Sequence, residues 1–262
     1  MANPMYRQIA EHLRAQIESG NLKPGQQLET ELELRERYSA SRNTVRDAIK
    51  WLINLGLVQT RPGQGTYVVE KIAPFVMTLS GAPETGDSLV YQFQVSQLGR
   101  TPSSSVVQVE IQLANAGVAA ELGLPEGSRV VSRHQRRFID AKPWSLQTSF
   151  YPMELALKGA GDLLIASNIE QGAVQYLADT LGLRQVAYRD WVTVRAPDNT
   201  EASFFDLPAD GRVAVYEVFR TAFEQTGAPI RVTVTVFPTD RNQFIFENGP
   251  VPTHQGQPSA ED

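Results

Sequence analysis

Residues 41–69 read SRNTVRDAIKWLINLGLVQTRPGQGTYVV, and this stretch decides the fold of the first part of the chain. Ser41 is a predicted helix N-cap, because its hydroxyl oxygen can accept from the unpaired backbone N–H groups of a first helical turn. Gly56 would end this helix, because glycine adopts a positive φ at low cost. Between them, apolar residues recur at the three-and-four spacing of one buried helix face. They are Val45, Ala48, Ile49, Leu52, Ile53 and Leu55.

Hydrogen-bond donors occupy the other face of this helix. They are Arg42, Asn43, Thr44, Arg46 and Lys50. Arginine can bind guanine O6 and N7 with two hydrogen bonds and asparagine can bind adenine in the same way, whereas threonine and lysine suit phosphates. The N-terminal half of a recognition helix is the part that enters the major groove. This pattern predicts a DNA-reading helix.

Two short strands follow the helix, over residues 57–60 and 66–69. The Pro-Gly segment 61–65 joins them, which predicts a hairpin. Arg61 adds a positive charge, and Gly63 and Gly65 let backbone N–H groups come close to a phosphate or to the floor of a groove. A helix followed by a hairpin could also have a purely structural role. DNA binding is nevertheless the leading hypothesis.

Two further helices are predicted before the reading helix. Residues 6–17 place Ile9, Leu13 and Ile17 on one stripe. A helix over Glu31–Tyr38 would begin after Thr30, with Glu33 at the reciprocal position of a capping box. Three helices and a hairpin in residues 1–70 predict a winged helix-turn-helix domain.

The charge of the chain is unevenly distributed. The net charge is −5, yet residues 1–70 hold nine Lys and Arg and eight Asp and Glu, so this part is +1 and the remainder is −6. The acids of the second helix segment are expected to lie away from the reading helix; they are Glu29, Glu31, Glu33 and Glu36. A weakly basic face predicts tight DNA binding only by a dimer on two half-sites, with affinity falling as salt rises.

Composition excludes several other classes. The 262 residues contain no cysteine and three scattered histidines, so we expect no disulfide, no metal site and no cofactor. No secretory signal and no apolar run of membrane-spanning length appear. We expect a soluble cytoplasmic protein, associated with the nucleoid, with no membrane partner.

The second part of the chain has a different pattern. Residues 71–86 are rich in Pro and Gly without periodicity, which predicts a linker, and the tail 247–262 is predicted to be disordered. Between them, strands joined largely by hairpins predict an antiparallel sheet with helices, an α+β domain over residues 87–246. The expected strands are 106–113, 129–139, 143–151, 189–196, 213–223 and 229–236; the expected helices are 116–122 and 172–181.

This part also contains an internal repeat. AELGLPEGSRVV begins at Ala119 and ASFFDLPADGRVAV begins at Ala202. Each repeat combines a helix, an apolar-Pro turn and a hairpin, with turns expected at Ala141-Lys142 and Thr226-Gly227. The duplication predicts a pseudo-symmetric sheet with a pocket between its halves.

The first seventy residues resemble the winged-helix domain of the GntR family of bacterial transcription regulators. The motifs are YRQIAEHLRAQIESGNLKPGQQL, SRNTVRDAIKWL and GQGTYVV. The resemblance implies that Arg42, Asn43, Thr44 and Arg46 contact operator DNA and that Gly65 approaches the minor groove.

One position departs from the family pattern. Where the family usually has Pro-Ser-Glu-Arg, this chain has Glu-Thr-Glu-Leu at residues 29–32. A common arginine contact to DNA is therefore absent, and Leu32 is expected to pack inward.

Residues 87–246 resemble the UTRA effector-binding domain of the HutC branch of this family. The motifs are LGRTPSSSVVQVE, AAELGLPEGSRVV, KPWSLQTSFYP and GAPIRVTVTVFPTDRNQF. The resemblance implies a fold like that of chorismate lyase, a small-molecule pocket above the sheet, and a homodimer formed through this domain. The implied effector-binding residues are Arg133, Arg137, Gln147, Arg231, Phe237 and Arg241.

The effector class follows from substitutions in that set. Members that bind phosphosugars often have Glu at the positions of Gln147 and Arg231, and Ser at Gly172. The changes favour an anionic or carbonyl-rich effector, because arginine pairs bidentately with carboxylates. The alternative for each arginine is a solvated position or a salt bridge to a nearby acid, with candidates Asp190, Glu217 and Asp240.

The resemblance implies a repressor that binds a pseudo-palindromic operator as a homodimer under control of a small-molecule effector. Two alternatives stay open: a DNA-binding dimer whose second domain is a non-sensing scaffold, and a chorismate-lyase-like enzyme. The chain shows no nucleophile elbow or phosphate loop. His134, beside Arg133, is either a pocket donor or a structural residue.

Overall fold

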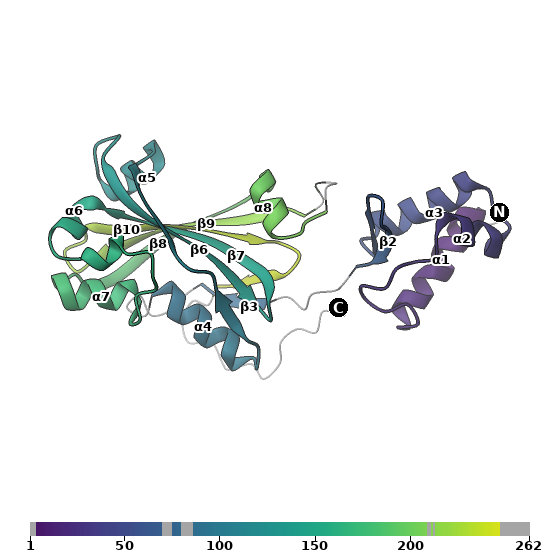
Figure 1. Cartoon of the computed structure of the whole chain (residues 1–262), viewed down its shortest axis with the longest axis horizontal. Coiled ribbons are helices and arrows are strands. Elements are labelled where there is room, and N and C mark those ends of the chain that lie inside the picture. Colours follow the sequence, from purple (N-terminus) through teal and green to yellow (C-terminus); the bar gives the residue numbers. More distant parts are fainter. Residues whose placement is uncertain (1–3, 70–74, 80–85, 209–210, 212, 247–262) are drawn as a thin grey trace. The chain divides into compact units, whose positions relative to one another are not determined.

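The computed structural model describes residues 4–69, 75–79, 86–208, 211 and 213–246. The chain divides into two compact units, Met1–Ala73 and Pro74–Asp262. Figure 1 labels their elements. The tail predicted for residues 247–262 lies outside the described residues.

The first unit contains three helices and a hairpin, as predicted. They are α1 (Met5–Glu18), α2 (Glu31–Tyr38), α3 (Arg42–Asn54), β1 (Val58–Arg61) and β2 (Gly65–Val68), with β1 and β2 antiparallel. Thr30 and Glu33 form a complete capping box at α2. Ser41 caps α3 by accepting from the backbone N–H of Thr44 at 3.1 Å, and Gly56 follows α3 with φ +69°. These local signals explain why the helix ends fall where they were predicted.

The core of this unit forms where α1 packs against α3. Four of the six apolar residues expected on the inner face of α3 are buried, namely Val45, Ala48, Ile49 and Leu52. Ile53 packs against the cluster from its edge. Leu55 is 47% exposed, because it is the C-cap residue, where the helical repeat ends. The buried stripe therefore fixes which face of α3 remains outside.

The second unit is built on a seven-stranded antiparallel sheet, which confirms the predicted α+β class. Its order is β4-β6-β7-β10-β9-β8, and β5 also pairs with β6. The strands are β4 (Pro102–Ser104), β5 (Gln108–Leu113), β6 (Arg129–Ile139), β7 (Lys142–Pro152), β8 (Gln185–Arg195), β9 (Val215–Glu224) and β10 (Pro229–Pro238). One hairpin turns at Asp140 and Ala141, with φ +52° and +61°, one residue before the expected Ala141-Lys142; the other turns at Gly227, with φ +86°, as expected.

The sheet order matches the internal repeat. The first repeat lies in α5 (Ala116–Leu122), β6 and β7, and the second lies in α8 (Asn199–Phe204), β9 and β10; one further strand precedes each repeat, β5 before the first and β8 before the second. The two last strands, β7 and β10, pair at the centre, with β6 and β9 outside them. The sheet is therefore pseudo-symmetric about the β7–β10 pair, as the duplication predicted.

Helices cover both faces of this sheet (Figure 1). Neighbouring residues of a strand point to opposite faces. Accordingly Val130 packs with α5, whereas Val131 packs with α6 (Met153–Leu157), the 3₁₀ helix η2 (Gly161–Leu164) and α7 (Gly172–Leu181). On this second face, the Tyr91 hydroxyl of α4 (Asp87–Gln97) donates to the Phe138 carbonyl at 2.6 Å. This face carries the cavity described below.

A strand lies within the stretch predicted to be a linker. β3 (Phe75–Thr78) pairs in parallel with β11 (Asn242–Ile245). Phe75 is fully buried and meets Trp144 edge to face at 6.0 Å. Just after β3, the Leu79 carbonyl accepts from the Tyr188 hydroxyl at 2.7 Å and from Arg220 Nη2 at 3.2 Å. The chain that enters the second unit is thus anchored to its sheet. Residues 70–74 and 80–85 lie outside the described part.

Candidate nucleic-acid interface and effector cavity

The polar face of α3 is exposed. Arg42, Arg46 and Lys50 follow one another at intervals of four residues, so they share one face of the helix. Their side chains are 67%, 54% and 74% exposed. Asn43 is also exposed, while the Thr44 hydroxyl lies 2.7 Å from the Ser41 hydroxyl at the N-terminus. The predicted base-reading and phosphate-binding side chains are therefore accessible to a ligand along one side of α3.

Two expectations about α2 are wrong. Glu31 does not lie away from the reading helix: its carboxylate is 3.3 Å from Arg42 Nε and 3.2 Å from Arg46 Nε. Leu32 does not pack inward and is 58% exposed. The physical reason is that Leu34, which is fully buried, occupies the core-facing position of this two-turn helix. Leu32, about 200° away around the helix axis, then faces outward.

The tip of the β1–β2 hairpin is held by side chains. The Gln64 carbonyl accepts from the Tyr67 hydroxyl at 3.1 Å and from Gln27 Nε2 at 2.9 Å. The Arg61 guanidinium lies over the Tyr67 ring, 4.7 Å from its centroid. Sequence reasoning missed Gln27, because it lies 37 residues from Gln64 and no local pattern links them.

Gly65→Ala is expected to destabilise the hairpin more than Gly63→Ala. Gly63 has φ +72° with open space around it, whereas Gly65 has φ +120° and a Cβ there would lie 2.4 Å from Gln27 Nε2. Alanine tolerates the first conformation far better than the second, which costs about 1–3 kcal/mol. Chemical denaturation of both variants measures the difference. Equal losses would show that neither the φ nor the Gln27 contact at Gly65 matters.

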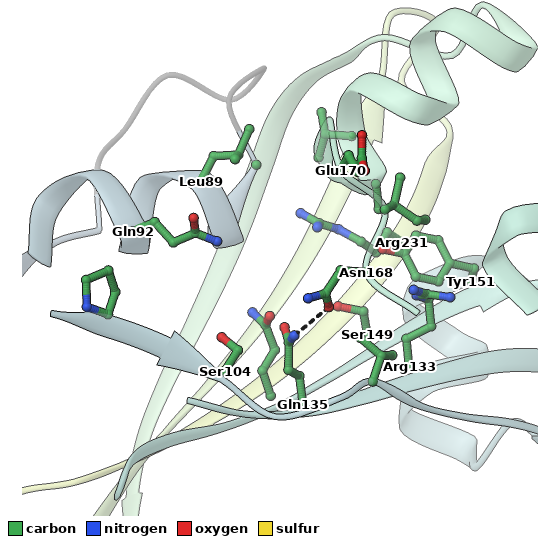
Figure 2. Close-up of a pocket in the computed structure, with 18 of the residues that line it drawn as sticks. Leu89, Gln92, Ser104, Arg133, Gln135, Ser149, Tyr151, Asn168, Glu170 and Arg231 are labelled. Carbon is green, nitrogen blue, oxygen red and sulfur yellow. Dashed lines mark hydrogen bonds between the residues drawn. The ribbon is translucent and has the colours of Figure 1, made fainter. Parts of the chain in front are cut away.

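A cavity of about 470 Å³ opens on the sheet face covered by α4 and α7 (Figure 2). Its floor is polar. Gln135 and Gln147 are directly paired in the sheet, as are Arg133 and Ser149. Asn168 and Glu170 come from the loop before α7, and Leu89 and Gln92 from α4. The volume is within the range of small-molecule sites, roughly 300–1,000 Å³.

Arg133 lines this cavity, and its donors are engaged by the loop beside it. Nη1 donates to the carbonyls of Asp162, Leu163 and Ile165 at 2.8–3.1 Å, and Nη2 donates to the Ser167 carbonyl at 2.6 Å. Burial lowers the pKa of this guanidinium. Arg133 therefore ties the segment 162–167 to β6.

Gln147 is supported from both neighbouring strands. Arg137 donates to its Oε1, and its Nε2 donates to the Thr235 hydroxyl at 3.3 Å. Arg137 is outside the cavity lining and lies under Tyr91, with Cζ 5.0 Å from the ring centroid. Burial raises the pKa of Tyr91 to about 12, so this phenol remains a hydrogen-bond donor. Arg137 acts here as a support for Gln147.

Of the three predicted effector-binding residues that follow β9, only one lines the cavity. Arg231, 5% exposed, lines the cavity and donates through Nη2 to Gln185 at 3.1 Å (Figure 2). Phe237 meets Phe244 edge to face at 5.2 Å, outside the cavity lining. Arg241 pairs with Asp240 at 2.8 Å and is also outside it. The salt-bridge alternative thus describes Arg241.

Several cavity residues were not predicted. Gln135 Nε2 donates to Asn168 Oδ1 at 2.9 Å (Figure 2). Gln135 and Ser149 share a face with Arg133 and Gln147, so strand alternation was a signal that could have found them. No such signal marks Asn168 in its loop.

The cavity lies mainly over β6 and β7, and the second repeat contributes Arg231 to its lining. It is therefore not centred between the two halves of the sheet, as the repeat had led us to expect.

His134 points away from the cavity lining. Its Nδ1 lies 2.9 Å from the Thr148 hydroxyl on β7, and burial lowers its pKa, with Arg136 acting in the same direction. The geometry supports a structural role for this histidine.

Among the described helices, none has the length and apolar character needed to cross a membrane.

A winged helix-turn-helix unit with arginines along its open helix face, in one chain with an α+β unit that holds a polar cavity, fits the class of DNA-binding regulators that carry a separate ligand-binding domain. Family models agree with this class. The model for bacterial regulatory proteins of the gntR family matches residues 5–68, and the UTRA domain model matches residues 97–243. The chain belongs to the GntR family, in the HutC branch that carries a UTRA domain.

Curated relatives and solved structures are consistent with this assignment. The chain is 26% identical to the HTH-type transcriptional repressor NagR of Bacillus subtilis over 243 residues, which cover 92% of this chain and 93% of NagR. It is 31% identical to the repressor MngR of Escherichia coli over 153 residues, 58% and 60% of the two chains. PhnF from Mycobacterium smegmatis shares the fold with TM-score 0.55 at 19% identity, over 92% and 98% of the two chains. The chain is a DNA-binding transcription regulator with a C-terminal effector-binding domain.

Proposed function

We propose that this regulator is a repressor that binds a pseudo-palindromic operator as a homodimer and is controlled by a small molecule in the cavity over β6 and β7. The observation that carries the DNA-binding role is the row of Arg42, Arg46 and Lys50 on the exposed face of α3. Relatives named as repressors support the sign of regulation. The site of action is the cytoplasm, where operator DNA lies.

The dimer follows from the electrostatics of the reading face. With a net charge of +1 over residues 1–70, one unit neutralises few phosphates. Two units on half-sites about 34–36 Å apart double the contacts and read both halves of a palindrome. The second unit supplies the dimer contact in this proposal.

The effector class follows from the cavity lining. Gln135, Gln147, Ser149 and Asn168 provide amide and hydroxyl groups, and Arg231 provides the positive charge. Since the Nη donors of Arg133 are engaged by backbone carbonyls, Arg231 is the cation that we assign to the effector. This combination fits a small polar molecule with a carboxylate or another anionic, carbonyl-rich group.

Control of DNA binding is proposed to pass through the N-terminal edge of the second unit. Leu89 and Gln92 of α4 line the cavity, and β3 with Leu79 is anchored to β11, Tyr188 and Arg220. An effector changes DNA affinity only if it binds one arrangement of these segments better than another. The sign of that preference decides between release and recruitment.

The test begins with the full chain and a random DNA library. Selection should yield a palindromic site that the chain protects in footprinting. Metabolite fractions are then screened for thermal shift and for release of that DNA. The effector, once purified from an active fraction and added at 100 times its Kd, should stabilise the protein by about 2.7 kcal/mol. Gln147→Leu should lose the ligand response and keep operator binding.

Other outcomes identify the alternatives. No thermal shift and no release by any fraction would favour a second domain that serves only as scaffold. We propose no catalytic activity for the cavity; turnover of a chorismate-like substrate would contradict this.

A further inference from the structure

Glu31 joins the two arginines that are proposed to read DNA. It is the first residue of α2, and its two carboxylate oxygens lie 3.3 Å from Arg42 Nε and 3.2 Å from Arg46 Nε. The Glu31 side chain is 37% exposed, less than either arginine. We call these three residues the Glu31 cluster. It places one acid inside the basic face of α3.

The atoms in contact leave a specific part of each guanidinium open. An arginine carries one N–H at Nε and four at its two Nη atoms, in a planar fork. In the Glu31 cluster the carboxylate occupies the Nε side of both side chains. Within the described part of the chain, no residue accepts from the Nη atoms of Arg42 or Arg46. The end of the fork, which fits guanine O6 and N7, is thus available on both residues.

The other acids of this segment have different roles. Glu33 is engaged in the capping box with Thr30, and Glu29 pairs with Arg37 at 2.7 Å. Glu36 lies on the same helix as Glu31 and forms no ion pair in the described structure. Of these four acids, Glu31 alone forms ion pairs with α3 in the described part of the chain.

We propose that Glu31 is a positioning residue that determines sequence discrimination by this regulator. It holds the Arg42 and Arg46 guanidinium groups by their Nε edges so that their Nη atoms meet guanine. Its negative charge also weakens the attraction of the same face for phosphates, on which sequence-independent binding depends. The proposal rests on the proposed reading role of Arg42 and Arg46.

The test compares Glu31→Gln with Glu36→Gln in the full chain. Fluorescence anisotropy measures the Kd of each protein for the selected operator and for a scrambled duplex of equal length, at several salt concentrations. Glu31→Gln should bind scrambled DNA about threefold or more tightly and lose operator preference, so that the ratio of the two Kd values falls about tenfold. Glu36→Gln should leave this ratio within about twofold.

A base analogue adds a readout that a merely structural role would not move. Replacing operator guanines by 7-deazaguanine removes the N7 acceptor. Operator affinity of the wild-type chain should fall on this replacement, and the Glu31→Gln chain should lose less. In an Arg42→Ala, Arg46→Ala background, Glu31→Gln should no longer change the Kd ratio, because residues that act through one another are not additive.

The outcomes separate the two proposals. If Glu31→Gln keeps the wild-type Kd ratio, or alters it equally without the two arginines, the role of Glu31 is overturned and the DNA-reading role stands. If the wild-type chain itself fails to distinguish operator from scrambled DNA, the proposed function fails instead. Circular dichroism of each variant checks that the helices are retained.

Discussion

Arg42→Ala is expected to lower operator affinity by roughly 30-fold to 25,000-fold. A bidentate arginine–guanine pair is worth about 1–3 kcal/mol, and a dimer would lose two such pairs, about 2–6 kcal/mol. Arg42 is 67% exposed at the N-terminus of α3, so its removal leaves no cavity and should not unfold the domain. Electrophoretic mobility shift or anisotropy with the selected operator measures the loss, and scrambled DNA should lose far less.

The matched control is Arg14→Ala. Arg14 lies on α1, is 47% exposed and pairs with Glu18 one turn away. It has the same charge and similar exposure but lies on a different helix, so operator affinity should change less than about threefold through the general electrostatic attraction. If Arg14→Ala and Arg42→Ala weaken operator binding equally, α3 is not the reading helix.

Arg220→Met is expected to lower the free energy of unfolding of the second unit by about 2–4 kcal/mol. Arg220 Nε and Nη2 contact the two Asp190 oxygens at 2.7 and 2.6 Å, and the two side chains are 14% and 12% exposed. Removing one partner leaves a carboxylate largely out of water, which costs about 3–5 kcal/mol when the pair is fully buried and less here. Urea unfolding followed by tryptophan fluorescence measures the change.

Two further variants make this prediction specific. Adding Asp190→Leu to Arg220→Met should recover most of the loss, because the isolated charge is then gone. Arg189 directly precedes Asp190 on β8 and serves as the comparison. Arg189→Met should lower the free energy of unfolding by less than about 1 kcal/mol, since Arg189 is 51% exposed and its pair with Glu121 is screened by water. Equal losses for Arg189→Met and Arg220→Met would contradict the assigned burial effect.

The Arg220–Asp190 pair also has a place in the control of DNA binding that we propose. Arg220 Nη2 and the Tyr188 hydroxyl both donate to the Leu79 carbonyl, and the Arg220 Cζ lies 3.8 Å from the Tyr188 ring centroid. Asp190 therefore orients a group that holds the chain where it enters the second unit. Sequence reasoning named Asp190 only as an alternative partner for the pocket arginines.

The sequence predicted the structure most accurately where the signals are local. The three helices of the first unit begin and end within one or two residues of their predicted bounds, because Ser41, Thr30 and Gly56 act within one helical turn. The β6–β7 and β9–β10 hairpins followed from short turns between alternating strands, and the repeat predicted a pseudo-symmetric sheet, which the strand order confirms.

Sequence reasoning was weaker where partners are distant along the chain. The parallel β3–β11 pair joins the two ends of the second unit, and nothing within residues 71–86 marked its partner. The cavity brought Arg133, Gln147 and Arg231 together but left Arg137, Phe237 and Arg241 outside its lining. Phe237 lies six positions from Arg231 along β10 and Arg241 lies beyond the end of that strand, so each meets different neighbours.

The sequence by itself determined the two-unit composition, the winged helix-turn-helix and the exposed basic face of α3, since caps and periodicity depend on near neighbours and on burial of one stripe. Only the tertiary structure decided what that face contains. Packing of α2 on α3 places the Glu31 carboxylate between Arg42 and Arg46 and turns Leu32 outward. Contacts between helices depend on the rotation of each helix about its own axis, and the buried Leu34, together with the core around it, sets that rotation.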